Sequence, residues 1–168
     1  DTLADPPSYD GKFVLTNPPY LARNKATDKH LFDRYDTNDL YKCFIISLIK
    51  DCPDGGIMII PLNFISSIRT NDIALRKRFL YKFDIIQINI FEEQVFEDTS
   101  YTICAIQFTQ KGDTQPFRVS IYPSNIQFNT NLTLNNNYMI GGQIYKLPIT
   151  DTYTITRLTK NNIQSKKE

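Results

Sequence analysis

The stretch Phe13-Val14-Leu15-Thr16-Asn17-Pro18-Pro19-Tyr20 decides the fold that we expect for this chain. Its first four residues are apolar or β-prone, which predicts a buried strand. Pro18 and Pro19 can neither donate to a sheet nor lead into a helix, so the strand must end at Asn17. Ligands of α/β sheets bind at the carboxyl ends of strands, so this stretch presents an amide, a carbonyl and a ring at a candidate binding edge.

This edge suits an amino group on an aromatic ring. The Pro18 carbonyl sits in a stiff segment with few local donors, and Asn17 adds a side-chain carbonyl beside it. Together they can accept both hydrogens of one NH2 group, while Tyr20 offers a face for stacking. Two acceptors favour the tetrahedral, nucleophilic form of an otherwise delocalised amine. Taken alone, however, the tetrapeptide is equally explained as a strand that ends in a Pro-Pro turn.

Asn-Pro-Pro-Tyr at a strand end resembles the amino-methyltransferases that use S-adenosylmethionine, in particular the gamma class of DNA adenine-N6 methyltransferases. Asp1 stands sixteen positions before Asn17, where that class has an acidic or polar residue that binds the cofactor's adenine. Three further segments resemble the family in the same order. Residues 39–44 resemble its Asn-Leu-Tyr-x-x-Phe segment, and residues 55–61 resemble its Gly-Gly turn and the strand that follows. Residues 93–96 resemble the loop whose Phe packs on the flipped base.

The resemblance implies a reaction, a cofactor, partners and roles for individual residues. The reaction is methyl transfer from S-adenosylmethionine to the N6 amino group of an adenine flipped out of double-stranded DNA, within a restriction–modification system that would add a cognate restriction endonuclease. It implies no metal. The catalytic residues would be Asn17, Pro18, Pro19 and Tyr20. The base would contact Tyr20, Phe44 and Phe96, and the cofactor would contact Asp1, Asn17 and Pro19.

Two alternatives stay open at this point. Methyltransferases that act on protein glutamine share the tetrapeptide, although residues 39–41 together with 95–96 resemble the base-methylating branch. The chain could also belong to a DNA-recognition or scaffolding subunit that keeps the fold without catalysis. A glycine turn in the sequence upstream would favour the enzyme.

The rest of the chain predicts an α/β, Rossmann-like methyltransferase fold with a mostly parallel sheet. Apolar periodicity predicts helices over 39–51 and from 70 or 71 to 83, and apolar runs predict strands over 57–62, 84–91, 101–109 and 117–122. The link between the strands at 84–91 and 101–109 is too short for a crossover helix, so we expect that pair to be antiparallel. Residues 21–38, which include His30, are expected to form an exposed polar loop.

The predicted domain organisation has three parts. Residues 1–122 would be the later half of a catalytic domain, 123–137 an Asn-rich linker, and 138–168 the beginning of a target-recognition domain. The chain has no Gly-x-Gly turn behind an apolar strand to hold the methionine part of the cofactor. We therefore expect it to be part of a longer, unpermuted enzyme and to be inactive alone, since the permuted class carries that turn downstream.

Composition narrows the possibilities further. An apolar share of 41% suffices for a core, and 19 basic against 18 acidic residues give no global attraction to nucleic acid, so any DNA contact must be local. Such a patch is offered by Arg69, Arg76, Lys77, Arg78 and Lys82 around the second helix, although a solvated face is the commoner cause of this pattern. The sequence shows no membrane-spanning run or secretory signal, and its three cysteines lack metal-ligand spacing, which predicts an intracellular, reduced protein.

Overall fold

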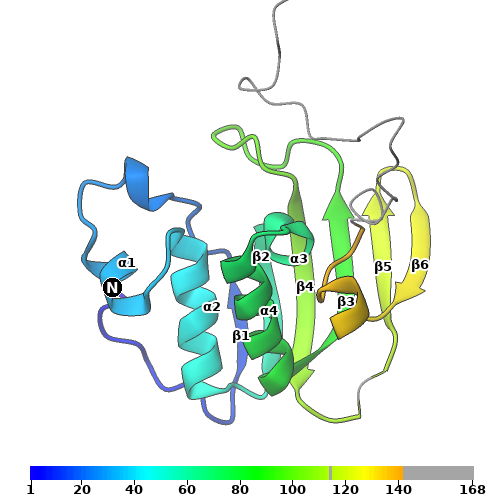
Figure 1. Ribbon diagram of the computed structural model, residues 1–168, viewed down its shortest axis with the longest axis horizontal. Helices are drawn as coiled ribbons and strands as arrows, with labels where there is room; N and C mark the ends of the chain where they lie inside the picture. The colour runs from blue at the N-terminus through cyan, green and yellow to red at the C-terminus, as the bar shows by residue number, and fades with distance from the viewer. Residues whose placement is uncertain (114, 142–168) are drawn as a thin grey trace, which may run out of the picture.

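The computed structural model describes residues 1–113 and 115–141 as a six-stranded sheet with helices packed against it (Figure 1). The strands are β1 (Phe13–Thr16), β2 (Gly55–Pro61), β3 (Phe83–Phe91), β4 (Ile103–Gln110), β5 (Phe117–Tyr122) and β6 (Ile126–Thr130). The helices are α1 (His30–Tyr35), α2 (Leu40–Asp51), α3 (Asn63–Ser66) and α4 (Thr70–Lys82), with short 3-10 helices η1 (Arg23–Lys25) and η2 (Leu134–Asn136).

The strand order is β1-β2-β4-β3-β5-β6. β1 pairs in parallel with β2, and β3 with β5, whereas β4 is antiparallel to both β2 and β3, and β6 is antiparallel to β5. Four strands therefore run one way, and β4 and β6 run the other way. This confirms the predicted α/β fold, including the reversed strand that the short link between β3 and β4 requires.

Gly55 and Gly56, expected in a turn, instead form the first two residues of β2. A side-chain carbon on Gly55 would lie 2.6 Å from the Phe108 carbonyl oxygen of β4. One on Gly56 would lie 2.2 Å from the Val14 carbonyl oxygen of β1. The glycine pair thus allows both neighbouring strands to approach the start of β2 closely.

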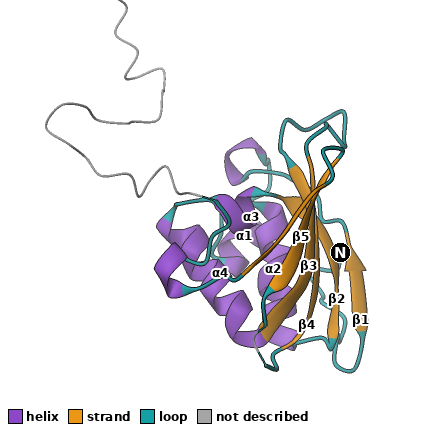
Figure 2. Cartoon of the chain, turned by 90° about the vertical axis from the view of Figure 1, so that its right-hand side faces the viewer, coloured by secondary structure: helices purple, strands orange, loops and turns teal. Residues whose placement is uncertain are grey.

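The described helices lie on one face of the sheet (Figure 2), and the core fills the space between them. Met58 and Ile106 of the sheet are completely buried there, and the Phe79 ring of α4 contacts the Phe108 ring with 5.4 Å between centroids. The expectation of a buried first strand was wrong, since Val14 and Thr16 are half-buried and the other two residues are exposed. Phe13 and Leu15 are 77% and 79% exposed, because β1 is an edge strand and alternate side chains point away from the helices.

The expected loop at 21–38 contains more structure than predicted. It includes η1 and α1, and the Phe32 and Tyr35 side chains of α1 are buried. The Tyr35 hydroxyl donates to the Leu3 carbonyl oxygen at 2.9 Å, which ties α1 to the N-terminal segment. His30 is exposed, as predicted. The charged residues of this segment hid an apolar stripe that is only one helical turn long.

The expected Asn-rich linker at 123–137 was wrong where it covers β6, which pairs with β5 from Phe117↔Thr130 to Ile121↔Ile126. Backbone pairing at a sheet edge places little demand on side chains, so asparagines did not prevent it. The chain then returns to the helices, where Met139 is buried and the Ile140 amide donates to the Ile65 carbonyl oxygen at 2.9 Å. The remainder of the predicted 138–168 domain lies outside the described residues from position 142.

The two long helices confirm the predicted periodicity, since α2 and α4 occupy the expected ranges. The connector expected between β2 and α4 contains the short helix α3. None of the described helices is long and apolar enough to cross a membrane.

Candidate active site

The site is built where β1 ends, and its first group is the amide of Asn17. The ladder between β1 and β2 stops at the pair Thr16↔Met58, and Asn17 follows as an exposed residue. The Tyr20 hydroxyl oxygen lies 2.9 Å from Asn17 Oδ1 and 2.8 Å from the Ile59 carbonyl oxygen of β2. In the described part of the chain no donor contacts the Pro18 carbonyl oxygen. The end of β1 therefore brings together an amide oxygen and a phenol ring.

Two further rings flank Tyr20. The Tyr41 ring of α2 meets it edge-on, with 6.4 Å between centroids and an interplanar angle of 87°. On another side lies Phe96 from the loop between β3 and β4, with 6.1 Å between centroids and an angle of 58°. The structure thus brings the Tyr20 and Phe96 rings together. Because these rings are in contact, a base can lie between them only after Phe96 moves away.

The loop that carries Phe96 is bonded to neighbouring segments at its two ends, where the Glu92 amide donates to the Tyr122 carbonyl oxygen and the Thr102 carbonyl oxygen accepts the Leu62 amide, both at 2.8 Å. Its middle part is held by bonds within itself. Gln94 Nε2 donates to the carbonyl oxygens of Phe96 and Glu97, both at 3.0 Å. The Thr99 amide donates to the same Phe96 oxygen at 3.3 Å. Since these bonds join residues of one loop, the loop can shift without losing them.

Phe44 is placed differently from what we expected. It lines a cavity of about 250 Å³ together with Thr2, Pro7 and Thr16, on the side of β1 that faces α2. This position does not support the expected contact with the same base as Tyr20 and Phe96. Asp1, predicted to bind the cofactor, precedes Thr2, and its Oδ1 accepts the Leu3 amide at 2.8 Å. Two residues that line the cavity, Thr2 and Thr16, are therefore sequence neighbours of Asp1 and Asn17, which were predicted to contact the cofactor.

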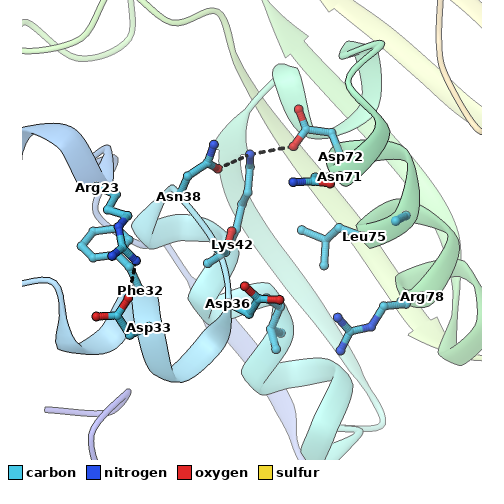
Figure 3. Close-up of a pocket in the computed structure, with 13 residues that line it drawn as sticks. Arg23, Phe32, Asp33, Asp36, Asn38, Lys42, Asn71, Asp72, Leu75 and Arg78 are labelled. Carbon is cyan, nitrogen blue, oxygen red and sulfur yellow. Dashed lines mark hydrogen bonds and ion pairs between the residues drawn. The ribbon is translucent and has the colours of Figure 1, made fainter.

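A buried ion-pair cluster behind the site was missed by the sequence analysis (Figure 3). Lys42 Nζ of α2 lies 2.8 Å from Asp39 Oδ2 and 2.6 Å from Asp72 Oδ1 of α4, and 3.1 Å from Asn38 Oδ1. Lys42 and Asp72 are only 5% and 4% exposed. The cluster borders a polar cavity of about 440 Å³ between the 23–38 segment, α2 and α4. The cluster joins the first turn of α2 to the first turn of α4. It also lies beside Tyr41, the residue before Lys42, whose ring contacts the Tyr20 ring.

The only sequence signal for this cluster was the all-round apolar character of the predicted helix at 39–51. Such a helix is buried on most of its surface, so a lysine within it needs an acidic partner. The sequence does not say which aspartate supplies it, because Asp72 is thirty positions away on another helix.

The tyrosine hydroxyls and cysteine thiols around the site stay in their neutral forms at ordinary pH. Burial raises the pKa of Tyr20 to about 12, and burial together with Asp39 and Asp72 raises the pKa of Tyr41. Burial raises the pKa of Cys43 to about 11 and also raises that of Cys104, so neither thiol is an activated nucleophile. Among residues 1–113 and 115–141, no group of three or more His, Cys, Asp or Glu side chains could hold a metal ion.

The basic patch predicted around α4 loses one member, because Arg76 is completely buried. Its guanidinium donates to the carbonyl oxygens of Phe64 at 2.9 Å, Ser67 at 2.8 Å and Asn137 at 3.2 Å. Arg76 therefore joins α4 to α3 and to the segment after β6. Lys77, Arg78 and Lys82 are exposed, as expected of a solvated face.

The reversed strand β4 between β2 and β3, with Asn-Pro-Pro-Tyr at the end of β1, defines a Rossmann-like domain of the methyltransferase type. Residues 8–96, more than half of the chain, match the Eco57I restriction-modification methylase family model. The chain therefore belongs to the Eco57I restriction-modification methylase family. No curated protein sequence matches it.

Solved structures with a similar fold come from restriction–modification enzymes. The methyltransferase subunit of a type I system from Streptococcus thermophilus is 16% identical, with a TM-score of 0.55 over 82% of this chain and 34% of that one. The EcoKI M protein, from a type I restriction enzyme, is 17% identical, with a TM-score of 0.51 over 72% and 27%. The DrdV–DNA complex gives 16% identity and a TM-score of 0.50 over 76% and 18%. At these identities the similarity establishes the fold, and this chain spans about a third or less of each protein.

Proposed function

We propose that this chain is part of a DNA methyltransferase of a restriction–modification system that methylates the N6 amino group of a flipped adenine. The observation that carries the proposal is Asn17 Oδ1, bonded to the Tyr20 hydroxyl directly after β1 ends. Membership of the Eco57I family supports it, and so does the DNA bound in the DrdV structure of similar fold. The same support favours double-stranded DNA over a glutamine side chain as the substrate.

The edge around Asn17 explains how an unreactive amine could become a nucleophile. Asn17 Oδ1 and the Pro18 carbonyl would accept the two hydrogens of the adenine amino group. With both hydrogens held, the nitrogen lone pair turns out of the ring plane toward the methyl donor. As the nitrogen attacked the methyl carbon, the bond from that carbon to the donor's sulfur would break with its electron pair left on the sulfur, and one proton of the nitrogen would leave to solvent after transfer. A strong base is not needed, which agrees with the neutral tyrosine and thiol groups around the site.

The residues present fit one wall of a site for S-adenosylmethionine. The cavity lined by Thr2, Pro7, Thr16 and Phe44 has mostly apolar walls, and Thr16 directly precedes Asn17 in the sequence. We propose that Phe44 and Asp1 contact the adenine ring of the cofactor there, with Asn17 and Pro19 facing its methyl group. When bound, S-adenosylmethionine supplies an electrophilic methyl group on a sulfonium. Phe44 is thus reassigned from the target base to the cofactor.

The base would lie against Tyr20, and Phe96 would close over it after the loop between β3 and β4 has moved. An aromatic platform of this kind holds any base, so the choice of adenine rests on its amino group at Asn17. The remaining expectations become part of the proposal: the enzyme acts where its DNA lies inside the cell, within a system that includes a cognate endonuclease. The described part of the chain would belong to the later half of its catalytic domain, inactive by itself, with β6 and residues 139–140 packed on that same domain.

Replacing Asn17 by Ala in the protein that carries this chain tests the proposal. Loss of one hydrogen bond made in the transition state should lower transfer of labelled methyl to duplex DNA by about a hundredfold or more. The free energy of unfolding should fall by no more than one hydrogen bond contributes, about 0.5–1.5 kcal/mol, because Asn17 is exposed and its Oδ1 is bonded to the Tyr20 hydroxyl. Asn24→Ala, at another exposed asparagine, is the matched control and should keep full activity.

Near-normal turnover of the Asn17→Ala variant would refute the assigned role. A protein without substitutions that methylates no duplex, yet methylates a glutamine-containing protein, would refute the DNA substrate. A protein that binds duplex DNA and methylates neither would support the non-catalytic alternative.

A further inference from the structure

The hydroxyl of Tyr20 takes the place of a backbone donor that β1 cannot provide. The parallel ladder between β1 and β2 ends at Thr16↔Met58, and Ile59 is the next residue of β2. Pro18 and Pro19 have no N–H, so the chain beyond β1 cannot continue the ladder with those residues. The Tyr20 hydroxyl instead lies 2.8 Å from the Ile59 carbonyl oxygen. The side chain therefore extends the contact between β1 and β2 past the prolines.

The same hydroxyl also reaches the proposed catalytic amide. Its oxygen lies 2.9 Å from Asn17 Oδ1, and both Asn17 Oδ1 and the Ile59 oxygen are acceptors. A phenol carries one proton, so it cannot make two full hydrogen bonds at once. When another donor occupies Asn17 Oδ1, the Tyr20 proton still has the Ile59 oxygen as its acceptor.

We propose that the Tyr20 hydroxyl is a positioning group that holds Asn17 Oδ1 in the empty site and releases it to the incoming amino group while staying bound to Ile59. This deepens, and rests on, the proposed function. The bond to Ile59 fixes the ring so that its face stays aimed at the base. The bond to Asn17 keeps the amide oxygen turned toward the site before substrate arrives. The ring stacks on the base, and the hydroxyl orients the acceptor.

The surroundings of Tyr20 agree with this role. The edge contact with Tyr41 limits rotation of the ring on one side, so the hydroxyl has few other positions to adopt. Partial burial raises the pKa of Tyr20 to about 12, so the hydroxyl remains a protonated donor at neutral pH. The Ile59 oxygen belongs to a strand paired on both sides and does not move with the site.

A double-mutant cycle on the 168-residue chain tests the hydrogen bonds without any need for activity. Tyr20→Phe should lower the folding equilibrium constant roughly two- to twelvefold, the range for one hydrogen bond. Asn17→Ala on top of Tyr20→Phe should cost less than it does alone, because the shared bond is already lost. Tyr81→Phe is the matched control, since Tyr81 is 78% exposed, and it should leave the equilibrium unchanged.

A second measurement uses Asn17→Ala alone and keeps the tyrosine in place. With isotope-labelled tyrosine Cζ, the magnetic resonance signal of Tyr20 should shift in this variant, because its hydroxyl has lost one acceptor. The signal of Tyr81 should not shift. Additive effects in the cycle, or an unmoved Tyr20 signal, would overturn the proposed contact.

In the protein that carries this chain, Tyr20→Phe should lower kcat about three- to tenfold, as expected for the loss of one positioning hydrogen bond. The KM for duplex DNA should stay within about twofold, because the stacking ring is kept. A lowered affinity with normal kcat would instead mean that the hydroxyl serves binding, and would overturn the positioning role. If the unaltered protein methylates no DNA, the proposed function fails, while the cycle on the chain still decides the hydrogen bonds.

Discussion

Replacing Arg76 by Ala should destabilise the fold strongly, although the sequence places Arg76 in a run of basic residues on a helix. Its side chain is completely buried between α4, α3 and the segment after β6. Three carbonyl oxygens, of Phe64, Ser67 and Asn137, accept hydrogen bonds from its guanidinium. Truncation removes one donor group from all three oxygens and leaves a cavity.

The size of the effect follows from two opposing contributions. Hydrogen bonds to a charged group contribute about 1.5–3 kcal/mol each, so three of them have a gross value of several kcal/mol. Against this stands the cost of burying the cation, which lowers the pKa of Arg76 to about 10 although Asp72 opposes the shift. Its Nε also has no partner among the described residues. We therefore expect a net loss of about 3–5 kcal/mol in the free energy of unfolding, similar to breaking a buried ion pair.

Urea denaturation of the 168-residue chain measures this loss as a lowered midpoint with an unchanged slope. Lys77→Ala is the matched control, because Lys77 is the adjacent basic residue of α4 and is exposed, and its cost should stay within about 0.5 kcal/mol. If Arg76 instead faced DNA, Arg76→Ala would cost little stability. The slope of the logarithm of DNA affinity against the logarithm of salt concentration would then decrease by the contribution of about one phosphate contact. That pair of results would refute the reasoning.

Three further predictions concern the site and its support. Lys42→Met should lower the free energy of unfolding by about 3–5 kcal/mol, because it leaves two carboxylates without their cation. Lys12→Met, at an exposed position, is the control and should not lower it. Equal urea midpoints for the two variants would contradict this prediction. Phe96→Ala and Tyr20→Ala should each weaken base capture by about 1–3 kcal/mol, and the two losses should be non-additive because both rings contact one base. The fluorescence of 2-aminopurine at the target position measures this capture. Strictly additive losses would contradict a shared base. Burial raises the pKa of Cys43 from 9.0 to about 11 and that of Tyr20 from 10.0 to about 12, and it also raises the pKa values of Cys104 and Tyr41. The unfolded chain therefore ionises first, and stability should fall as pH rises above about 9; midpoints that do not fall between about pH 9 and 12 would contradict this.

Elements with a strong apolar pattern were predictable from the sequence. The helix α2, the strand β2 and the antiparallel pair β3 and β4 all followed from apolar runs and from the length of the link between them. Elements held by few apolar residues were not. The helix α1 depends on Phe32 and Tyr35 within a charged segment, and β6 depends on backbone pairing rather than on its side chains.

The candidate site divides in the same way. The sequence predicted the Asn-Pro-Pro-Tyr edge because two prolines end a strand in only a few ways, and the family resemblance supplied Phe96. It did not predict Tyr41 as a support for Tyr20, or the Lys42 cluster, because these contacts join residues on different elements. Their side chains also looked like a core residue and a surface lysine. Packing between elements decided their roles.

The two sides of the proposed base site differ in how firmly they are held. Asn17 and Tyr20 are tied to β2 through the Ile59 oxygen, and Tyr20 is backed by Tyr41 on a helix fixed by buried ion pairs. Phe96 lies in the middle of a loop that is bonded to neighbouring segments only at its ends, and the hydrogen bonds around Phe96 itself are internal to the loop. Because Phe96 touches Tyr20 in the empty site, a base can enter by moving the loop and leaving the amide in place.

This difference separates the effects that substitutions should have on the reaction. Changes in the loop alter how readily the base is captured, and so alter the KM for DNA and the 2-aminopurine signal. Changes behind Tyr20 alter how well the acceptors are aimed once the base has arrived, and so alter kcat. A variant such as Asp72→Asn, which weakens the ion-pair cluster without touching the edge, should lower kcat while the capture signal stays normal. If it changes capture instead, the cluster does not act through Tyr41 and Tyr20.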